Sequence, residues 1–185
     1  MKVFQMFSMA AVIAMIALSS CSSSKKAADS ASSSELSMID QKVQEFAANS
    51  NFTEKTTEVK VPEKATISIW SDAEGQIQKI TKVAMTPGGE KRVDYFFSDN
   101  NLVYSYHTTK NSLKQKGKTI FEDTKYYFGN NKLLSAMSRT TNVSSKSLDE
   151  AEAKIAKSKF KSFTPTINVL RDELAVIKKL KQTVK

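Results

Sequence analysis

The chain has 185 residues, a formal net charge of +9, one cysteine and one histidine. Its length corresponds to one ordinary domain behind a short N-terminal extension. A single cysteine excludes an intrachain disulfide, so folding depends on the hydrophobic core. One histidine and one cysteine are too few for the usual zinc site, which takes three or four nitrogen, sulfur or oxygen ligands. We therefore expect no metal and no cofactor.

The N-terminal segment carries a basic residue, Lys2, and leads into an unbroken apolar run from Met9 to Leu18. A basic start, an apolar segment of roughly ten residues and small residues after it are typical of a secretory signal peptide. The run is too short for a comfortable transmembrane helix, which needs roughly 20 residues. We therefore predict a signal peptide over residues 1–20.

The segment Leu18-Ser19-Ser20-Cys21 resembles the lipobox of bacterial lipoproteins. The resemblance implies cleavage before Cys21 and attachment of fatty acyl chains, such as palmitate, to this residue. Acylated Cys21 would then anchor the chain in membrane lipid. Residues 22–34 are mostly Ser, Ala and Lys and contain no large apolar side chain, so residues 21–34 are predicted to be a lipidated, flexible tether. Residues 35–185 remain as a single globular domain.

An amphipathic helix is predicted at the start of this domain, because apolar residues recur there at helical spacing: Leu36, Ile39, Val43 and Phe46. Ser34 is its expected N-cap. The pattern ends at Asn49-Ser50-Asn51, where polar residues with low helix propensity interrupt it.

Six strands are predicted between residues 65 and 140, separated by turns that contain Gly, Asn or Pro. Their expected ranges are 66–71, 77–85, 91–97, 102–108, 118–128 and 133–138, with a longer polar loop over 110–117. Such short connections require antiparallel neighbours. Tyr95–Leu102 and Tyr126–Leu133 share one pattern of an aromatic triplet, a four-residue polar turn and a leucine. This repetition predicts two equivalent hairpins.

Two helices are predicted at the C-terminus. Ser147-Leu148-Asp149-Glu150 fits a capping box, and Pro165 fits the first turn of a second helix. The apolar face of that second helix comprises Ile167, Leu170, Leu174, Ile177, Leu180 and Val184. The predicted fold is α+β: an antiparallel meander sheet of about six strands, with an N-terminal helix and two C-terminal helices packed on one face.

The residues that could support catalysis are few. His107 is expected on the exposed face of its strand, and no G-x-S-x-G or comparable nucleophile turn accompanies it. Glu122 and Asp123 are adjacent on a predicted strand, so their side chains point to opposite faces and cannot act as a carboxylate pair. We predict no catalytic residue and no enzyme activity.

Aromatic side chains give the main candidate binding surface. If helices cover one face of the sheet, the other could expose a platform able to stack on a sugar, a peptide or a partner's apolar surface. The tyrosines proposed for it are Tyr95, Tyr104, Tyr106, Tyr126 and Tyr127. The competing interpretation, which we favour, is that cross-strand aromatic pairs simply stabilise the sheet.

The aromatic–Asn hairpins and the lipobox together resemble uncharacterised lipoproteins of Bacteroidota-type bacteria. The resemblance implies a cell-envelope location, and Ser22 after Cys21 favours the periplasm-facing side of the outer membrane. We expect a non-enzymatic binding module for an envelope protein or glycan, and no nucleic acid partner. The alternatives are a structural protein that binds acidic polymers through basic segments 110–118, 154–161 and 178–185, and a hydrolase with an unrecognised site.

Overall fold

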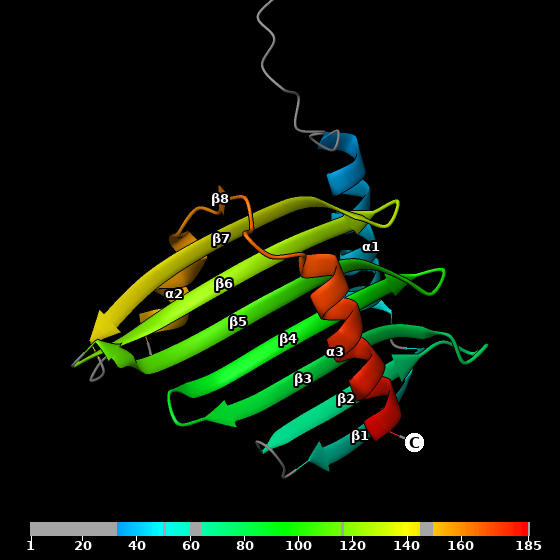
Figure 1. Cartoon of the computed structure of the whole chain (residues 1–185), viewed down its shortest axis with the longest axis horizontal. Coiled ribbons are helices and arrows are strands. Elements are labelled where there is room, and N and C mark those ends of the chain that lie inside the picture. The colour runs from blue at the N-terminus through cyan, green and yellow to red at the C-terminus, as the bar shows by residue number, and fades with distance from the viewer. Residues whose placement is uncertain (1–32, 50, 60–63, 116, 145–149, 185) are drawn as a thin grey trace, which may run out of the picture.

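The computed structural model describes residues 33–49, 51–59, 64–115, 117–144 and 150–184. The predicted signal peptide, Cys21 and almost all of the tether lie outside these ranges. The described residues form three helices and eight strands (Figure 1): α1 Ser33–Ala48, β1 Thr53–Val59, β2 Ala65–Ser71, β3 Ile77–Thr86, β4 Gly89–Ser98, β5 Asn101–Gln115, β6 Lys118–Gly129, β7 Lys132–Ser144, α2 Ala151–Lys157, β8 Lys161–Ser162 and α3 Val169–Thr183.

All eight strands belong to one sheet, in which the strand order β1 to β8 follows the chain and every neighbouring pair is antiparallel. The meander is therefore confirmed, but the predicted count of six was too low. β1 was missed because Thr53–Val59 is a largely exposed edge strand with charged residues, and β8 because it has only two residues. Charged side chains on an edge strand also protect it from pairing with other chains.

The polar loop predicted over 110–117 is instead mostly strand. β5 continues to Gln115 and pairs Lys110 with Phe121 and Asn111 with Ile120. One face of an antiparallel sheet can be exposed to water, so the ends of these strands can carry polar side chains. For the same reason β7 extends beyond its predicted end, to Ser144.

The two faces of the sheet are covered by different helices, which corrects the prediction that all three helices share one face. α1 packs on one face through Ile39, in a cluster with Tyr104, Tyr127 and Leu134. α2 lies on that same side against β6 and β7, whereas α3 lies across the opposite face (Figure 1). Contiguous aromatic residues put large rings on both faces, so both faces need a cover.

α3 covers the larger apolar cluster. Val169, Ile177 and Leu180 pack against sheet residues that include Ile80, Tyr95 and Phe128, among others. The helix begins at Val169, with the Asn168 side chain accepting a hydrogen bond from the Arg171 amide, and not at Pro165 as predicted.

The other predicted helix starts are also corrected. α1 begins at Ser33, so Ser34 lies within the helix and is not its N-cap. α2 begins at Ala151, with Glu150 at the N-cap position and no side-chain cap. Ser147, the expected N-cap of that helix, lies outside the described residues.

A buried carboxylate holds polar groups together under α1. Asp94 receives Arg92 Nε at 2.8 Å, Lys79 Nζ at 3.1 Å and the hydroxyl of Thr81. Burial raises the pKa of Asp94, but the hydrogen bonds from Arg92 and Thr81 and the charges of Lys79 and Arg92 outweigh it and hold the pKa below its usual value. Lys79 Nζ also lies 5.0–5.4 Å from the ring centres of Trp70, Phe96 and Phe46, which connects this cluster to the end of α1.

Candidate functional site

The two hairpins that share a sequence pattern have the same backbone at their turns. Asp99 and Asn100 have φ values of 51° and 62°, and Asn130 and Asn131 have φ values of 51° and 57°. Positive φ at both central residues defines a type I′ turn, which matches the twist of the flanking strands and favours Asn, Asp and Gly. We call Ser98–Asn101 the first tip and Gly129–Lys132 the second tip. The predicted equivalence of the hairpins is confirmed.

Each of these hairpins also carries a strand irregularity at the same point of the pattern. The register shifts between Phe96 and Phe97 in the first and between Tyr127 and Phe128 in the second. Such bulges bend a strand and increase its twist. The pairing of β5 with β6 starts at Tyr104 opposite Tyr127, so the strand ends 101–103 and 128–129 are not paired with each other. The two tips therefore separate and leave a hollow between them.

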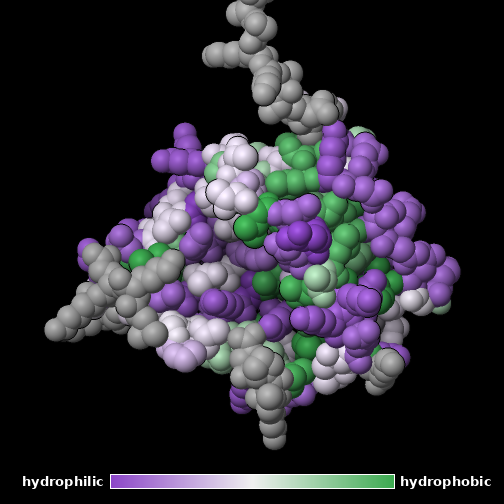
Figure 2. All heavy atoms as spheres, viewed as in Figure 1, coloured by the Kyte–Doolittle hydropathy of each residue, from purple (hydrophilic) through white to green (hydrophobic). Residues whose placement is uncertain are grey.

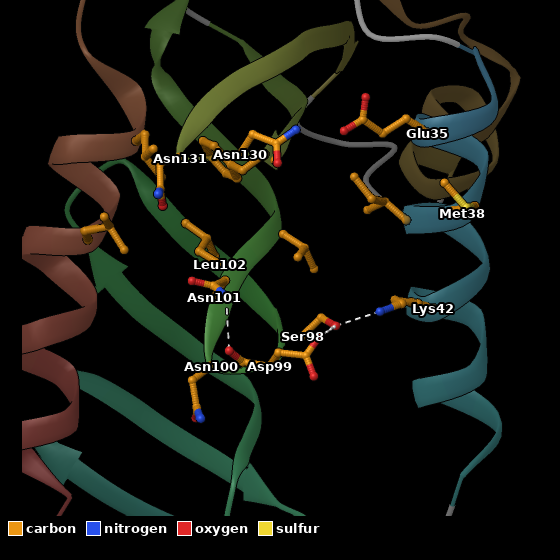
Figure 3. Close-up of a pocket in the computed structure, with 16 residues that line it drawn as sticks. Glu35, Met38, Lys42, Ser98, Asp99, Asn100, Asn101, Leu102, Asn130 and Asn131 are labelled. Atoms are coloured by element: carbon orange, nitrogen blue, oxygen red, sulfur yellow. Dashed lines mark hydrogen bonds between the residues drawn. The ribbon is translucent and has the colours of Figure 1, made fainter.

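This hollow, the tip pocket, has a volume of about 560 Å³ and lies between the two tips, α1 and the start of α3 (Figure 3). Glu35 and Lys42 reach toward it from α1, Met38 lines it from the same helix, and Leu170 and Leu174 line it from α3. Pockets of about 300–1,000 Å³ that combine apolar walls with a few polar groups are typical of ligand sites.

α1 contacts the same position of both hairpins. Lys42 Nζ donates a hydrogen bond of 2.6 Å to Ser98 Oγ on the first tip. At the equivalent position of the second tip, Gly129 leaves room for Glu35, whose Oε1 would be only 2.9 Å from a Cβ there. Seven helical residues span about 10.5 Å, close to the roughly 9.6 Å across two strand spacings. The spacing of Glu35 and Lys42 along the helix therefore matches the separation of the tips.

The polar rim of the tip pocket consists mainly of carboxamides. The side chains of Asn100, Asn130 and Asn131 form no hydrogen bond with another residue in the described part of the chain. Asn101 Nδ2 donates to the Asp99 carbonyl at 3.1 Å. The free carboxamides can both donate and accept hydrogen bonds to a ligand.

Apolar side chains form the rest of the pocket. Ile39, Leu102 and Phe128 are buried at its base. Met38 is 59% exposed and Leu174 is 46% exposed, although both are large and apolar. On the α3 side of the molecule, hydrophobic residues gather around α3 and toward the hairpin tips (Figure 2). Exposed apolar groups next to a concave polar rim favour a binding site.

The five tyrosines proposed as a binding platform do not form one. Tyr95 and Tyr126 pack with the cluster under α3, whereas Tyr104, Tyr106 and Tyr127 pack with the cluster under α1. Tyr95, Tyr104 and Tyr127 are buried, and this burial raises the pKa of each well above its ordinary value. Burial, together with a hydrogen bond to Asp123, raises the pKa of Tyr106 to about 12.

His107 was expected at an exposed position, but it lies partly buried under α3. Its Nε2 is 2.7 Å from Glu173 Oε1 and 3.3 Å from Ser105 Oγ. In a serine hydrolase triad the nucleophile and the carboxylate bind different ring nitrogens, and the nucleophile must reach substrate. Here both partners share Nε2, and Ser105 is fully buried. The arrangement fits a buried polar contact that positions α3.

The tip pocket itself was not predicted, although the sequence held a signal for it. In a meander, every second turn lies at the same end of the sheet. The two turns of the repeated pattern are two strands apart, so they had to be neighbours. What the pattern could not show is which helix residues close the space between them.

Among the described residues, no group of three or more His, Cys, Asp or Glu side chains is placed to hold a metal ion. None of the described helices has both the length and the apolar character required to cross a membrane. Searches against protein-family models, curated proteins and solved structures each found no match.

Proposed function

We propose that this chain is a lipid-anchored envelope lipoprotein that acts as a non-enzymatic binding module, with the tip pocket as its binding site. The observation that carries the proposal is the tip pocket: three carboxamides without a partner among the described residues, around an apolar base. Attachment through acylated Cys21 and a periplasm-facing position at the outer membrane are parts of the same proposal, supported by the lipobox resemblance and the short apolar run before it.

The position of α1 supports a connection between anchor and site. α1 starts at Ser33, twelve residues after Cys21, and its first two turns supply Glu35, Met38 and Ile39 to the tip pocket. A chain of twelve residues reaches at most about 40 Å. An anchored domain would therefore hold the tip pocket close to the membrane, within reach of other envelope components.

A binding role agrees better with the site than catalysis does. The titratable side chains that line the pocket are Glu35, Lys42 and Asp99, and the last two are exposed to water. Lys42 Nζ and Asp99 Oδ2 both hydrogen-bond to Ser98 Oγ. Active sites usually place their acids and bases in desolvated surroundings, unlike this open rim. The buried set of Ser105, His107 and Glu173 lacks the geometry of a hydrolase.

The proposal is tested in whole cells with the full chain carrying a photo-crosslinking amino acid. Position 174 lies in the tip pocket, and position 85 is the matched control, because Met85 is also exposed and apolar but lies at the opposite end of the sheet. We expect defined adducts from position 174 only, and their loss in Cys21→Ala. Equal adducts from both positions, or none, would contradict the assigned site. Mass spectrometry that finds Cys21 unmodified and residues 1–20 still attached would contradict the anchor.

A further inference from the structure

We infer that the tip pocket takes an N-acetylated amino sugar of a glycan chain. This inference rests on the proposed function, because it names the ligand class of the same site. An N-acetylated amino sugar offers hydroxyl groups, one amide and one methyl group. Each of these features has a counterpart in the pocket.

The polar side of the match comes from the carboxamides. Asn130 and Asn131 lie on the second tip, and Asn100 lies on the first. None of their side chains forms a hydrogen bond with another described residue. A carboxamide donates hydrogen bonds through its NH₂ group and accepts them through its oxygen. Hydroxyl groups and amides likewise both donate and accept hydrogen bonds. The hydroxyl groups and the amide of such a sugar can therefore both donate hydrogen bonds to these carboxamides and accept hydrogen bonds from them.

The charges favour an uncharged ligand with hydroxyl donors. Two carboxylates, Glu35 and Asp99, line the pocket against one ammonium, Lys42. Lys42 Nζ and Asp99 Oδ2 are both hydrogen-bonded to Ser98 Oγ. Repulsion by the carboxylates opposes an anionic polymer here, although the chain as a whole is basic. Hydroxyl groups, in contrast, donate strong hydrogen bonds to carboxylates.

The apolar side of the match is small. Met38 and Leu174 stand on opposite walls, above the buried Leu102. A methyl group can contact one of these side chains while the rest of the ligand bonds the rim. A long acyl chain fits worse, because it would cover the free carboxamides and leave them without partners, and unpaired buried polar groups are unfavourable.

A peptide strand also fits worse. At both tips the backbone is already paired within its own hairpin, as Phe97 opposite Leu102 and Phe128 opposite Leu133 show. The strand ends that face the pocket, 101–103 and 128–129, are too short to pair with an added strand. Recognition in the pocket therefore depends on side chains, which suits a sugar.

The test measures binding of small probes to the purified full-length lipoprotein in detergent, by titration calorimetry. The probes are N,N′-diacetylchitobiose, cellobiose, which has hydroxyl groups but no N-acetyl group, and N-acetyl-trialanine amide as the peptide arm. The key variant is Asn131→Gly, which removes one carboxamide but keeps a residue that favours the type I′ turn. Asn142→Ala is the matched control, an exposed asparagine on β7 that does not line the pocket.

We expect diacetylchitobiose to bind, and cellobiose and the peptide to bind at least about tenfold more weakly. Asn131→Gly should weaken sugar binding roughly five- to tenfold, as expected for one lost hydrogen bond, with no fall in melting temperature, and Asn142→Ala should change nothing. Equal binding of the two sugars, tighter binding of the peptide, or unchanged binding by Asn131→Gly would overturn the ligand class. Absence of sugar binding while crosslinks from position 174 persist would overturn the ligand class but leave the proposed function standing.

Discussion

Replacing Asp94 by asparagine should destabilise the domain at neutral pH and have little effect in acid. Asp94 is buried and pairs with Lys79, which is largely buried, and with Arg92, whose side chain is 43% exposed. The substitution keeps the shape of the side chain but removes the negative charge, which leaves the two cations without a counterion.

The expected loss is about 2–4 kcal/mol at pH 7. Removing one partner of a fully buried ion pair costs about 3–5 kcal/mol. The part of this loss that comes from the pair with Arg92 is smaller. The exposed part of Arg92 can be hydrated by water, and exposed ion pairs contribute about 1 kcal/mol or less to stability. Contacts of Lys79 with three aromatic rings remain and offset part of the loss.

The pH dependence has a definite sign. The pKa of Asp94 is lower in the folded state than in the unfolded chain. The stability that its charge contributes is therefore fully present above the unfolded pKa of about 3.9, and it is lost as the pH falls through the lower, folded pKa. In that acidic range a protonated Asp94 and the uncharged carboxamide of the Asp94→Asn variant are equivalent, so the two proteins should converge.

Urea unfolding at pH 7 and at progressively lower pH measures this difference, with fluorescence of the single tryptophan, Trp70, as the probe. Asp172→Asn is the control, because Asp172 forms an exposed pair with Arg171 and its loss should cost less than about 1 kcal/mol. An Asp94→Asn protein as stable as the parent at pH 7, or a difference that persists unchanged in acid, would refute the reasoning.

Three glycine substitutions test the backbone and the contact between α1 and the second tip. Gly89→Ala should lower the free energy of unfolding by about 3 kcal/mol or more, because φ is +130° and the new Cβ would collide with the Lys110 carbonyl oxygen. Gly75→Ala, at φ +78° with open space around it, should lower it by only about 1 kcal/mol. Urea unfolding measures both, and equal losses would contradict this reasoning. Gly129→Ala should lower the free energy of unfolding by about 1–2 kcal/mol, because the new Cβ would lie 2.8 Å from Leu134 Cδ1 and 2.9 Å from Glu35 Oε1. The loss should be smaller in a Glu35→Ala background, where only the Leu134 clash remains; an identical loss in both backgrounds would show that the contact with Glu35 does not matter.

The sequence predicted local structure well where one residue pattern has one physical meaning. Alternation and turn residues located the central strands, and the Asp-Asn and Asn-Asn pairs marked the type I′ turns because few other residues tolerate positive φ. The edge strand β1 escaped because its side chains face water and carry charges, so no apolar alternation identifies it.

The arrangement of the helices was beyond the sequence pattern. Helical periodicity shows which side of a helix is apolar, but not which face of the sheet it covers. The aromatic triplets did place rings on both faces of the sheet, and as a consequence each face is covered by helices of its own. The candidate site was misplaced for the same reason, since a face with its own helix offers no open platform of tyrosines.

The final helix has a consequence for how the chain becomes a folded protein. Because strand order follows chain order, each hairpin can close over a short loop as the polypeptide emerges. The apolar surface around Ile80 and Phe128, however, stays exposed until α3 packs on it. A product truncated before Val169 would expose that surface and self-associate. The fifteen residues of α3 thus act as a protective cover, and this face of the sheet is safe from aggregation only once they are in place.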